Sequence, residues 1–315
     1  MLKTESKTSI KTKLLILAIM FTNSNLFSFD EGIAKSGNIE IYYRDYGPAD
    51  GEPILLVQGI GGQLINWPQH LIEFLIKNNF RPIVYDNRDT GLSSRIQNDS
   101  FNKDNVNKTI IRNYIRYYLR LPIKSEYTID DMADDGVSVL DHLNIENAHI
   151  LGISMGGMIA QIMASSYPEK IKTFTLIAST ASTPSPFNGP SKDVRRLFIE
   201  RTKNVDATIE DRVNRTKKLF KLIGYQGIDL DTQEFSDNVK LSIERGGVDD
   251  TGFGRQLTAI LGSKNRIEKV RSISAPTLII HGKDDPLIGV KNAYRSNKLI
   301  KGSKLVIIDN MRHLI

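Results

Sequence analysis

The 315-residue chain contains no cysteine. This absence excludes disulfide bonds, thiolate zinc sites, a cysteine nucleophile and a lipidated cysteine anchor. The sequence also has no His-Glu-x-x-His motif or other metal-ligand cluster, and no lysine of the Walker type follows the glycines at 59–62. We therefore expect neither a metal ion nor another cofactor.

Long apolar runs are also missing. The run Leu14–Phe21 has eight residues, whereas a membrane span needs about 20. A lysine-rich start precedes this run, and small polar residues follow it up to Ser28, which is typical of a secretory signal. We predict that residues 1–28 are a signal peptide and that the protein is periplasmic or secreted. An uncleaved anchor and a disordered tail of a cytoplasmic protein are the alternatives.

Positive charges are in small excess over negative charges. The net charge is +6, and four lysines and one glutamate in residues 1–28 supply half of it. The remaining excess gives no reason to expect a nucleic-acid partner.

One stretch combines arginines and apolar residues at helical spacing: Arg112, Arg116 and Arg120 beside Ile111, Ile115 and Leu119. Such a stripe could contact an anionic membrane. A solvated helix face is the more common use of this pattern, and we expect that here.

Short apolar runs alternate with helical patterns along most of the chain. A hairpin is expected at Gly32–Lys35 and Ile39–Tyr46. Strands of the buried parallel type are expected at Pro53–Val57, Pro82–Tyr85, Phe174–Ile177, Pro276–Ile280 and Lys304–Ile308, with a further strand ending at Gly152. Helices are expected at Pro68–Lys77, Lys108–Leu121, Ile129–Leu143 and Met155–Ser166. This alternation predicts an α/β protein with a mostly parallel sheet and helices on both faces.

Residues 181–275 interrupt the alternation. They contain no clear strand and are too many for a loop, so we expect a structured insertion. Its helical patterns lie at Asp193–Thr202, Ile209–Leu222, Phe235–Ile243 and Gly254–Leu261. The sequence thus predicts a core formed by residues 29–180 and 276–315, with a helical cap at 181–275.

The sequence Gly152-Ile153-Ser154-Met155-Gly156 lies between an expected strand and an expected helix. This is the Gly-x-Ser-x-Gly pattern of a nucleophile elbow, in which a sharp turn exposes the serine hydroxyl. Side chains at the two glycines would collide with the neighbouring strand and helix. The pattern predicts Ser154 as a nucleophile, with the amides at the start of the helix facing an oxyanion.

A serine nucleophile needs a base, normally a histidine oriented by a carboxylate. Of the five histidines, His70 and His142 fall within expected helices, His149 begins a strand, and His281 ends one. His313 follows the last strand, at the carboxyl edge where ligands bind in open α/β sheets, and we predict it as the base. Asp284 and Asp285 follow the preceding strand at the same edge, and either could orient it.

These motifs give the chain a wider resemblance. Residues Asp86–Ser93 are similar to the Asp-x-Arg-x-x-Gly-x-Ser loop of α/β-hydrolase-fold serine hydrolases, and Ser, Asp and His follow in the order of that fold. Asp131–Ala133 and Ala148–Gln161 resemble the branch that includes aclacinomycin methylesterase-type carboxylesterases. The resemblance implies an α/β-hydrolase fold with a helical cap.

The resemblance also assigns residues. It implies Asp285, three residues after Gly282, as the acid, and the amides of Ile60 and Met155 as the oxyanion hole. Two positions depart from the family pattern: Gln58 replaces a common histidine, and Arg312 replaces a common glycine before the catalytic histidine.

We therefore expect a cofactor-free hydrolase of a small-molecule carboxylic ester with an apolar part. A lipase, a carbon–carbon bond hydrolase, a perhydrolase and an inactive ligand-binding homologue remain alternatives, because a fold does not determine the substrate. The sequence leaves the oligomeric state open. Several cap aromatics are expected to line an acyl pocket: Phe187, Phe198, Phe220, Tyr225, Phe235 and Phe253.

The end of the chain gives a last expectation. Proteins of this fold usually continue into a helix that covers the final strand, whose residues Leu305–Ile308 are apolar on both faces. Because only two residues follow His313, we expect this chain to be a truncated form.

Overall fold

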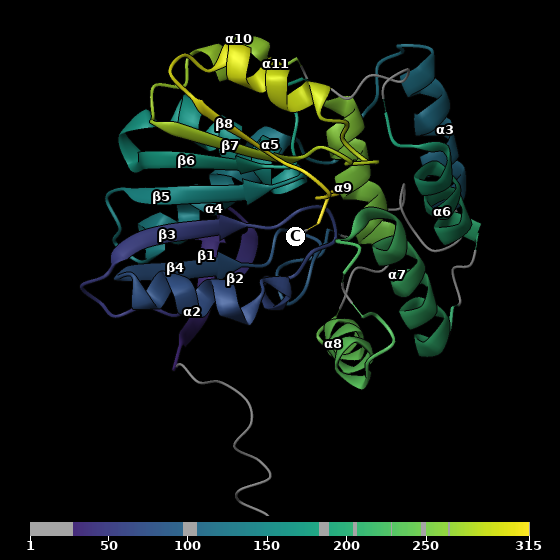
Figure 1. Cartoon of the computed structure of the whole chain (residues 1–315), viewed down its shortest axis with the longest axis horizontal. Helices are drawn as coiled ribbons and strands as arrows, with labels where there is room; N and C mark the ends of the chain where they lie inside the picture. The colour runs from purple at the N-terminus through teal and green to yellow at the C-terminus, as the bar shows by residue number, and fades with distance from the viewer. Residues whose placement is uncertain are drawn as a thin grey trace, which may run out of the picture.

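The computed structural model describes residues 28–96, 106–182, 189–203, 207–227, 229–246, 250–263 and 265–314. Within these residues, eight strands form one sheet in the order β1-β2-β4-β3-β5-β6-β7-β8 (Figure 1). The strands are β1 (Asp30–Ser36), β2 (Ile39–Asp45), β3 (Glu52–Val57), β4 (Phe80–Tyr85), β5 (Ala148–Ile153), β6 (Ile171–Ile177), β7 (Thr277–Gly282) and β8 (Lys304–Ile308).

The pairing of the strands confirms the expected mixed sheet. Strand β1 pairs with β2, and β2 with β4, in antiparallel fashion, while all the pairs from β4 to β8 are parallel. Gly37 closes the β1–β2 hairpin with φ of 59°, a conformation that glycine adopts without steric cost. The carboxyl ends of the six parallel strands therefore share one edge of the sheet.

Helices cover both faces of the sheet, as the sequence predicted. One face carries α4 (Ile129–His142), α5 (Met155–Ser166), α10 (Ile267–Arg271) and α11 (Lys291–Leu299), and its core includes buried residues of all four. The other face carries α2 (Gln69–Lys77), whose Ile72 and Leu75 are buried against it. Thr128 begins α4, where its hydroxyl accepts a 3.2 Å hydrogen bond from the Asp131 amide, as expected of an N-cap.

Strand β8 is covered on one face. Leu305 and Ile307 pack on the core, while Val306 is 44% and Ile308 40% exposed. Among the described residues, nothing covers the face of β8 that carries Val306 and Ile308.

A second layer of helices lies beyond the carboxyl edge of the sheet (Figure 1). It contains α6 (Lys192–Lys203), α7 (Ile209–Ile223), α8 (Gln233–Glu244) and α9 (Asp250–Gly262), close to the four helices expected of the cap. Helix α3 (Val106–Tyr118) packs against α9 and α6 and so lies in the same layer. In contrast, α10 falls within 181–275 but packs on α5 and α11. The cap boundaries at 181 and 275 stay a prediction.

Across the described residues, no helix has the length and apolar character needed to cross a membrane. The expected signal peptide lies almost wholly outside these residues, so its role stays a prediction.

Candidate active site

Ser154 lies on the sharp turn that the sequence predicted, between Ile153 of β5 and Met155 of α5. Its backbone has φ of 56° and ψ of −119°, a strained conformation for a residue with a side chain. Two hydrogen bonds hold the turn: the Ser154 amide donates to the Ile177 carbonyl at 3.0 Å, and the Ser179 hydroxyl donates to the Ser154 carbonyl at 2.7 Å. The surrounding fold thus maintains the strain that presents the side chain.

The two glycines of the elbow have the steric role that the pattern predicted. A Cβ atom on Gly156 would lie 2.0 Å from the Val57 carbonyl oxygen, and one on Gly152 would lie 2.4 Å from the Gly156 oxygen. Because these neighbours are backbone atoms, they cannot move aside cheaply. The helix can therefore approach the sheet this closely only with glycine at both positions.

Asp285 and His313 meet at the same edge of the sheet. The Nδ1 atom of His313 lies 2.8 Å from Oδ2 of Asp285, and the side chains are 2% and 0% exposed. The other carboxylate oxygen accepts 2.8 Å hydrogen bonds from the amides of Leu287 and Ile288. Asp284 is exposed, so the structure brings Asp285 rather than its neighbour to the histidine.

The electrostatic surroundings keep Asp285 ionised. Burial alone would raise the pKa of this carboxyl group. The charge of His313 and hydrogen bonds from His281, His313 and the Ile288 amide outweigh burial and hold the pKa well below its usual range. A carboxylate at this point fixes the proton on Nδ1 of His313, which leaves Nε2 free to accept a proton.

His281 is a member of this cluster whose role the sequence did not reveal. Its Nε2 atom lies 2.6 Å from the Ile288 carbonyl oxygen and 3.3 Å from Oδ2 of Asp285. Both neighbours are acceptors, so we place the proton on Nε2; Nδ1 has no partner among the described residues. His281 thus gives Asp285 a second imidazole donor. Its position at the end of β7, four residues before Asp285, was the available signal.

The contact between nucleophile and base is not formed. Among the described residues, the Ser154 hydroxyl makes no hydrogen bond to His313, although both side chains are buried near the carboxyl edge. Catalytic hydrogen bonds are often long in unliganded proteins and shorten when substrate binds. The structure therefore joins two of the three predicted residues directly.

The loop after β3 lies against Ser154. A Cβ atom on Gly59 would be 3.2 Å from the Ser154 Cβ and 3.7 Å from its Oγ. Within the described parts of the chain, neither Ile60 nor Met155 uses its amide in a hydrogen bond outside the helices and strands. Met155 is the first residue of α5, where amides lack a partner within the helix. Both predicted oxyanion-hole amides therefore remain available.

Gln256 of α9 anchors this loop from the cap. Its side-chain oxygen accepts a 2.9 Å hydrogen bond from the Gly61 amide. Its side-chain nitrogen donates to the Arg88 carbonyl at 2.9 Å and to the Thr90 hydroxyl at 2.8 Å. Gln256 is fully buried, and no sequence pattern identified it.

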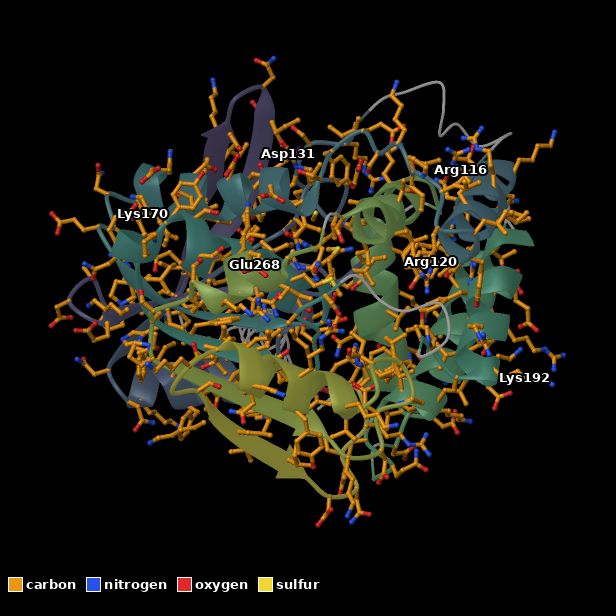
Figure 2. All side chains as sticks on the ribbon, turned by 90° about the horizontal axis from the view of Figure 1, so that it is seen from above. Arg116, Arg120, Asp131, Lys170, Lys192 and Glu268 are labelled. Atoms are coloured by element: carbon orange, nitrogen blue, oxygen red, sulfur yellow. The ribbon has the colours of Figure 1, made fainter. Side chains whose placement is uncertain are left out.

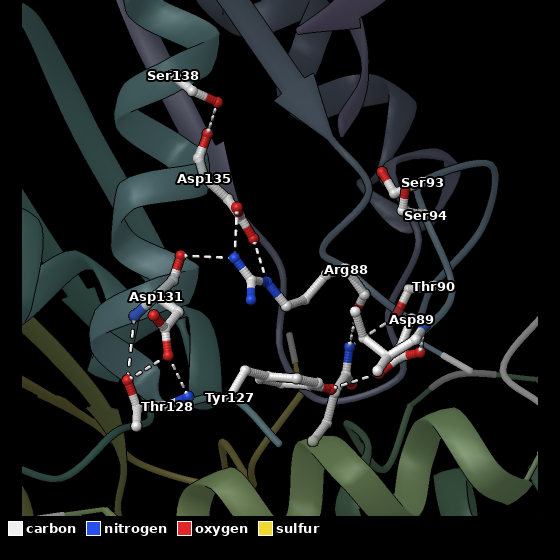
Figure 3. A network of polar contacts seen from close by, with 12 residues as sticks. Arg88, Asp89, Thr90, Ser93, Ser94, Tyr127, Thr128, Asp131, Asp135 and Ser138 are labelled. Atoms are coloured by element: carbon white, nitrogen blue, oxygen red, sulfur yellow. Dashed lines mark hydrogen bonds and ion pairs between the residues drawn. The ribbon is translucent and has the colours of Figure 1, made fainter. Parts of the chain in front are cut away.

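Two buried ion pairs fix the 86–93 loop next to it, and Figure 3 shows the one between Arg88 and Asp135. Arg88 donates two hydrogen bonds, of 2.6 and 2.7 Å, to Asp135 of α4. Asp89 receives bonds of 2.9 and 2.7 Å from Arg255 of α9 and one of 2.8 Å from the Tyr127 hydroxyl. These contacts connect the cap, the motif loop and the core.

The same loop shows why its motif needs aspartate and glycine. Asp86 accepts hydrogen bonds from the Leu64 amide at 2.7 Å and the Leu92 amide at 3.0 Å, and Arg245 of the cap lies 3.3 Å away. Burial raises the pKa of Asp86 despite these partners. At Gly91, with φ of 55°, a Cβ atom would lie 2.1 Å from the Asp86 carboxylate.

Arg312, where the family commonly has glycine, holds the histidine loop to the cap. Its guanidinium donates to the carbonyls of Lys221 and Leu222 at 2.9 and 2.8 Å, at the carboxyl end of α7. The His313 amide donates to the Ile223 carbonyl at 2.9 Å. The unusual residue therefore satisfies helix-end carbonyls that would otherwise lack partners.

The cap aromatics mainly pack on one another. Phe198 of α6 and Phe253 of α9 have ring centroids 5.9 Å apart, and Phe220 of α7 and Phe235 of α8 lie 5.2 Å apart. Tyr225 is exposed, and Phe187 lies outside the described residues. An acyl pocket formed by these side chains stays a prediction.

Comparison with known proteins agrees with this geometry. The family profile described as alpha/beta hydrolase fold matches residues 52–315. Rhodomycin D methylesterase of Streptomyces peucetius is 25% identical over 94% of this chain and 92% of its own length. The enzyme of that name from Streptomyces sp. strain C5 is 27% identical over 85% and 86%. These relatives confirm the resemblance to methylesterase-type carboxylesterases.

A solved structure shows the same fold. The meta-cleavage product hydrolase of Pseudomonas fluorescens IP01 aligns with a TM-score of 0.65 and 22% identity over 92% of each chain.

Proposed function

The chain belongs to the α/β-hydrolase-fold family, and on this premise we propose that it hydrolyses a carboxylic ester through an acyl-enzyme formed on Ser154. The observation that carries the proposal is the buried Asp285–His313 pair at the same sheet edge as the strained Ser154. The relatives named for methyl-ester hydrolysis support an ester as the substrate.

The reaction follows from the roles of these groups. Nε2 of His313 accepts the Ser154 proton while Oγ attacks the acyl carbon, and Asp285 stabilises the imidazolium that forms. The amides of Ile60 and Met155 donate to the oxyanion. The imidazolium then protonates the departing alcohol, and a water molecule, deprotonated by His313, releases the acid.

For the substrate, we propose a small-molecule ester with an apolar acyl or alkyl part. Lipase, carbon–carbon hydrolase and perhydrolase activity, and binding without catalysis, are the alternatives within this fold. Rates on p-nitrophenyl esters of graded acyl length would identify the preferred acyl size, and equal rates on long emulsified and short soluble esters would favour a lipase.

Labelling by a fluorophosphonate tests the nucleophile. We expect the probe to attach to Ser154, and Ser154→Ala to lose both labelling and ester hydrolysis. Ser165→Ala, on the same helix, should keep both, because its hydroxyl donates to the Ile162 carbonyl and contacts no group of the site among the described residues. Attachment of the probe to another serine would refute the assignment.

We also propose export to the periplasm or the medium, supported by the lysine-rich and apolar pattern of residues 1–28. Fractionation of the producing cell, with the mass of the isolated protein, tests this. Recovery of the uncleaved chain from the cytoplasm would contradict it.

A further inference from the structure

Helix α3 and the turn after it expose an unusual number of large apolar side chains. Five such residues are between 42% and 63% exposed: Ile111, Ile115, Tyr118, Leu119 and Leu121. Single exposed apolar residues are normal on a protein surface, but a contiguous group on one element indicates a contact surface. The sequence alone favoured a solvated face for this stripe; the exposure of these side chains changes that preference.

Ile111, Ile115 and Tyr118 lie on one face of the helix, and Leu119 and Leu121 follow directly after it. Residues 111 and 115 are one turn apart, and 118 and 119 follow at the next turn. The opposite face is buried in the cap layer, where Val106 and Ile110 form a small core with Leu257 and Asn113 donates to the Thr258 hydroxyl at 3.1 Å. Helix α3 is therefore fixed in place, and its apolar outer face is a stable part of the surface.

The segment that carries this face is strongly basic. Residues 106–125 include five cations and no acidic residue: Lys108, Arg112, Arg116, Arg120 and Lys124. None of the five forms an ion pair within the described part of the chain. Figure 2 shows Arg116 and Arg120 on the side of the molecule that α3 and α6 form, with Lys192 of α6 at its edge.

A hollow lies beside this face, between the basic side of α3 and the segment that follows the helix. It is lined by Arg112, Asn113, Arg116, Pro122, Ile123 and Lys124. Arg116 is oriented there by a 2.7 Å hydrogen bond from its Nε to the Pro122 carbonyl. Its terminal nitrogens have no partner among the residues that the structure describes, so they can contact an anion. Three cations around one hollow provide the donors and charge that a phosphate group requires.

We propose that this surface, formed by α3 and the segment to Lys124, docks on an anionic lipid bilayer. The isoleucines and leucines would enter the boundary between headgroups and acyl chains, and the arginines would contact lipid phosphates. A second copy fits poorly, because it would place five cations against five. A nucleic acid would match the charge but would leave the aliphatic side chains without an apolar partner.

Vesicle binding with a charge-matched control tests the proposal. The full chain should co-sediment with vesicles of phosphatidylcholine containing phosphatidylglycerol, and much less with phosphatidylcholine alone. The variant Arg112→Gln, Arg116→Gln, Arg120→Gln should bind about a hundredfold more weakly, since each basic residue near such a surface contributes about fivefold. The control Lys291→Gln, Lys298→Gln, Lys301→Gln removes the same charge from α11 and its following turn and should bind almost like the wild type.

A site-specific probe separates α3 from any contribution of the N-terminal segment. Because the chain has no cysteine, Leu119→Cys can be labelled singly with an environment-sensitive fluorophore. We expect its emission to shift to the blue on anionic vesicles. The same label at Phe74→Cys on α2, which is 61% exposed against 63% for Leu119, should show no shift.

Three outcomes would overturn the proposal. The first is an equal loss of binding in the two triple variants, and the second is an unchanged emission of labelled Leu119→Cys on anionic vesicles. The third is a dimer that forms without lipid and that only the α3 triple variant disrupts. The last would assign the surface to a second copy. Esterase rates on a soluble substrate should be equal in all these variants.

Discussion

At the scale of single residues, Asp285 has more partners than a triad acid requires. It accepts from two imidazoles and two amides while almost fully buried. An asparagine in its place would turn its NH₂ group toward at least one of these N–H donors. It would also favour the His313 tautomer that carries the proton on Nε2, which cannot accept the serine proton. Asp285→Asn should therefore lower kcat by about 10³- to 10⁴-fold.

The neighbouring residue provides the control for this substitution. Asp284 is exposed, and its carboxylate contacts neither histidine. Asp284→Asn should leave kcat within about twofold in the same assay with a p-nitrophenyl ester. A larger loss at Asp284 than at Asp285 would contradict the geometry.

The lowered pKa of Asp285 also predicts how stability depends on pH. A carboxyl group whose pKa is lower in the folded protein than in the unfolded chain stabilises the fold above its unfolded value of about 4. This contribution is lost as the pH falls from there through the folded value. The free energy of unfolding of the wild type should thus fall more steeply below pH 4 than that of Asp285→Asn, as measured by urea denaturation. If the free energy of unfolding depended on pH in the same way in the two proteins, Asp285 would not be the source of this pH-dependent stability.

At the scale of elements, the helices and strands that could be predicted from the sequence are those with a local apolar period or a motif. Strands β3 to β7 lie within about three residues of the expected bounds, because buried parallel strands are continuous apolar runs. Helix α11 was missed because its buried residues include the small Ala293 and Ser296, which give no apolar period. The five-residue α10 is too short to show one.

Contacts between distant segments could not be predicted in this way. Gln256 and Gly61 are 195 positions apart, and Arg255 and Asp89 are 166 apart. No spacing rule connects such positions, since the fold alone brings them together. Ser154, Asp285 and His313 could be predicted from the sequence because each follows a strand at the same edge of the sheet. The position of α3 beside α9 could not be predicted.

Gln256 gives a test of one such contact. Gln256→Leu removes the acceptor of the Gly61 amide and should shift the Ile60 amide away from the oxyanion. We expect kcat to fall by about 10- to 100-fold, below the 10²- to 10³-fold effect of deleting an oxyanion donor outright, with little change in KM. Gln233→Leu, on the exposed side of α8, is the matched control. An increase in KM alone would indicate a role in substrate binding instead.

At the scale of the whole molecule, the cap and the core are joined by buried polar contacts. The Arg255 side chain is 3% exposed and that of Asp89 is 0% exposed. Truncating one member of a buried ion pair leaves the other charge without compensation, at a cost of about 3–5 kcal/mol. Arg255→Met should therefore lower the free energy of unfolding by about that amount, measured by urea denaturation near neutral pH.

A second substitution separates this cost from lost packing. Asp89 has φ of 67°, a conformation that asparagine tolerates, so Asp89→Asn removes the charge and keeps the backbone. In the Arg255→Met background it should restore part of the stability, because position 89 then no longer holds a buried charge without its ion-pair partner. Arg271→Met breaks an exposed pair with Glu268 and should cost about 0–1 kcal/mol. If Arg255→Met and Arg271→Met had equal effects, the Asp89–Arg255 pair would not be what holds the cap to the core.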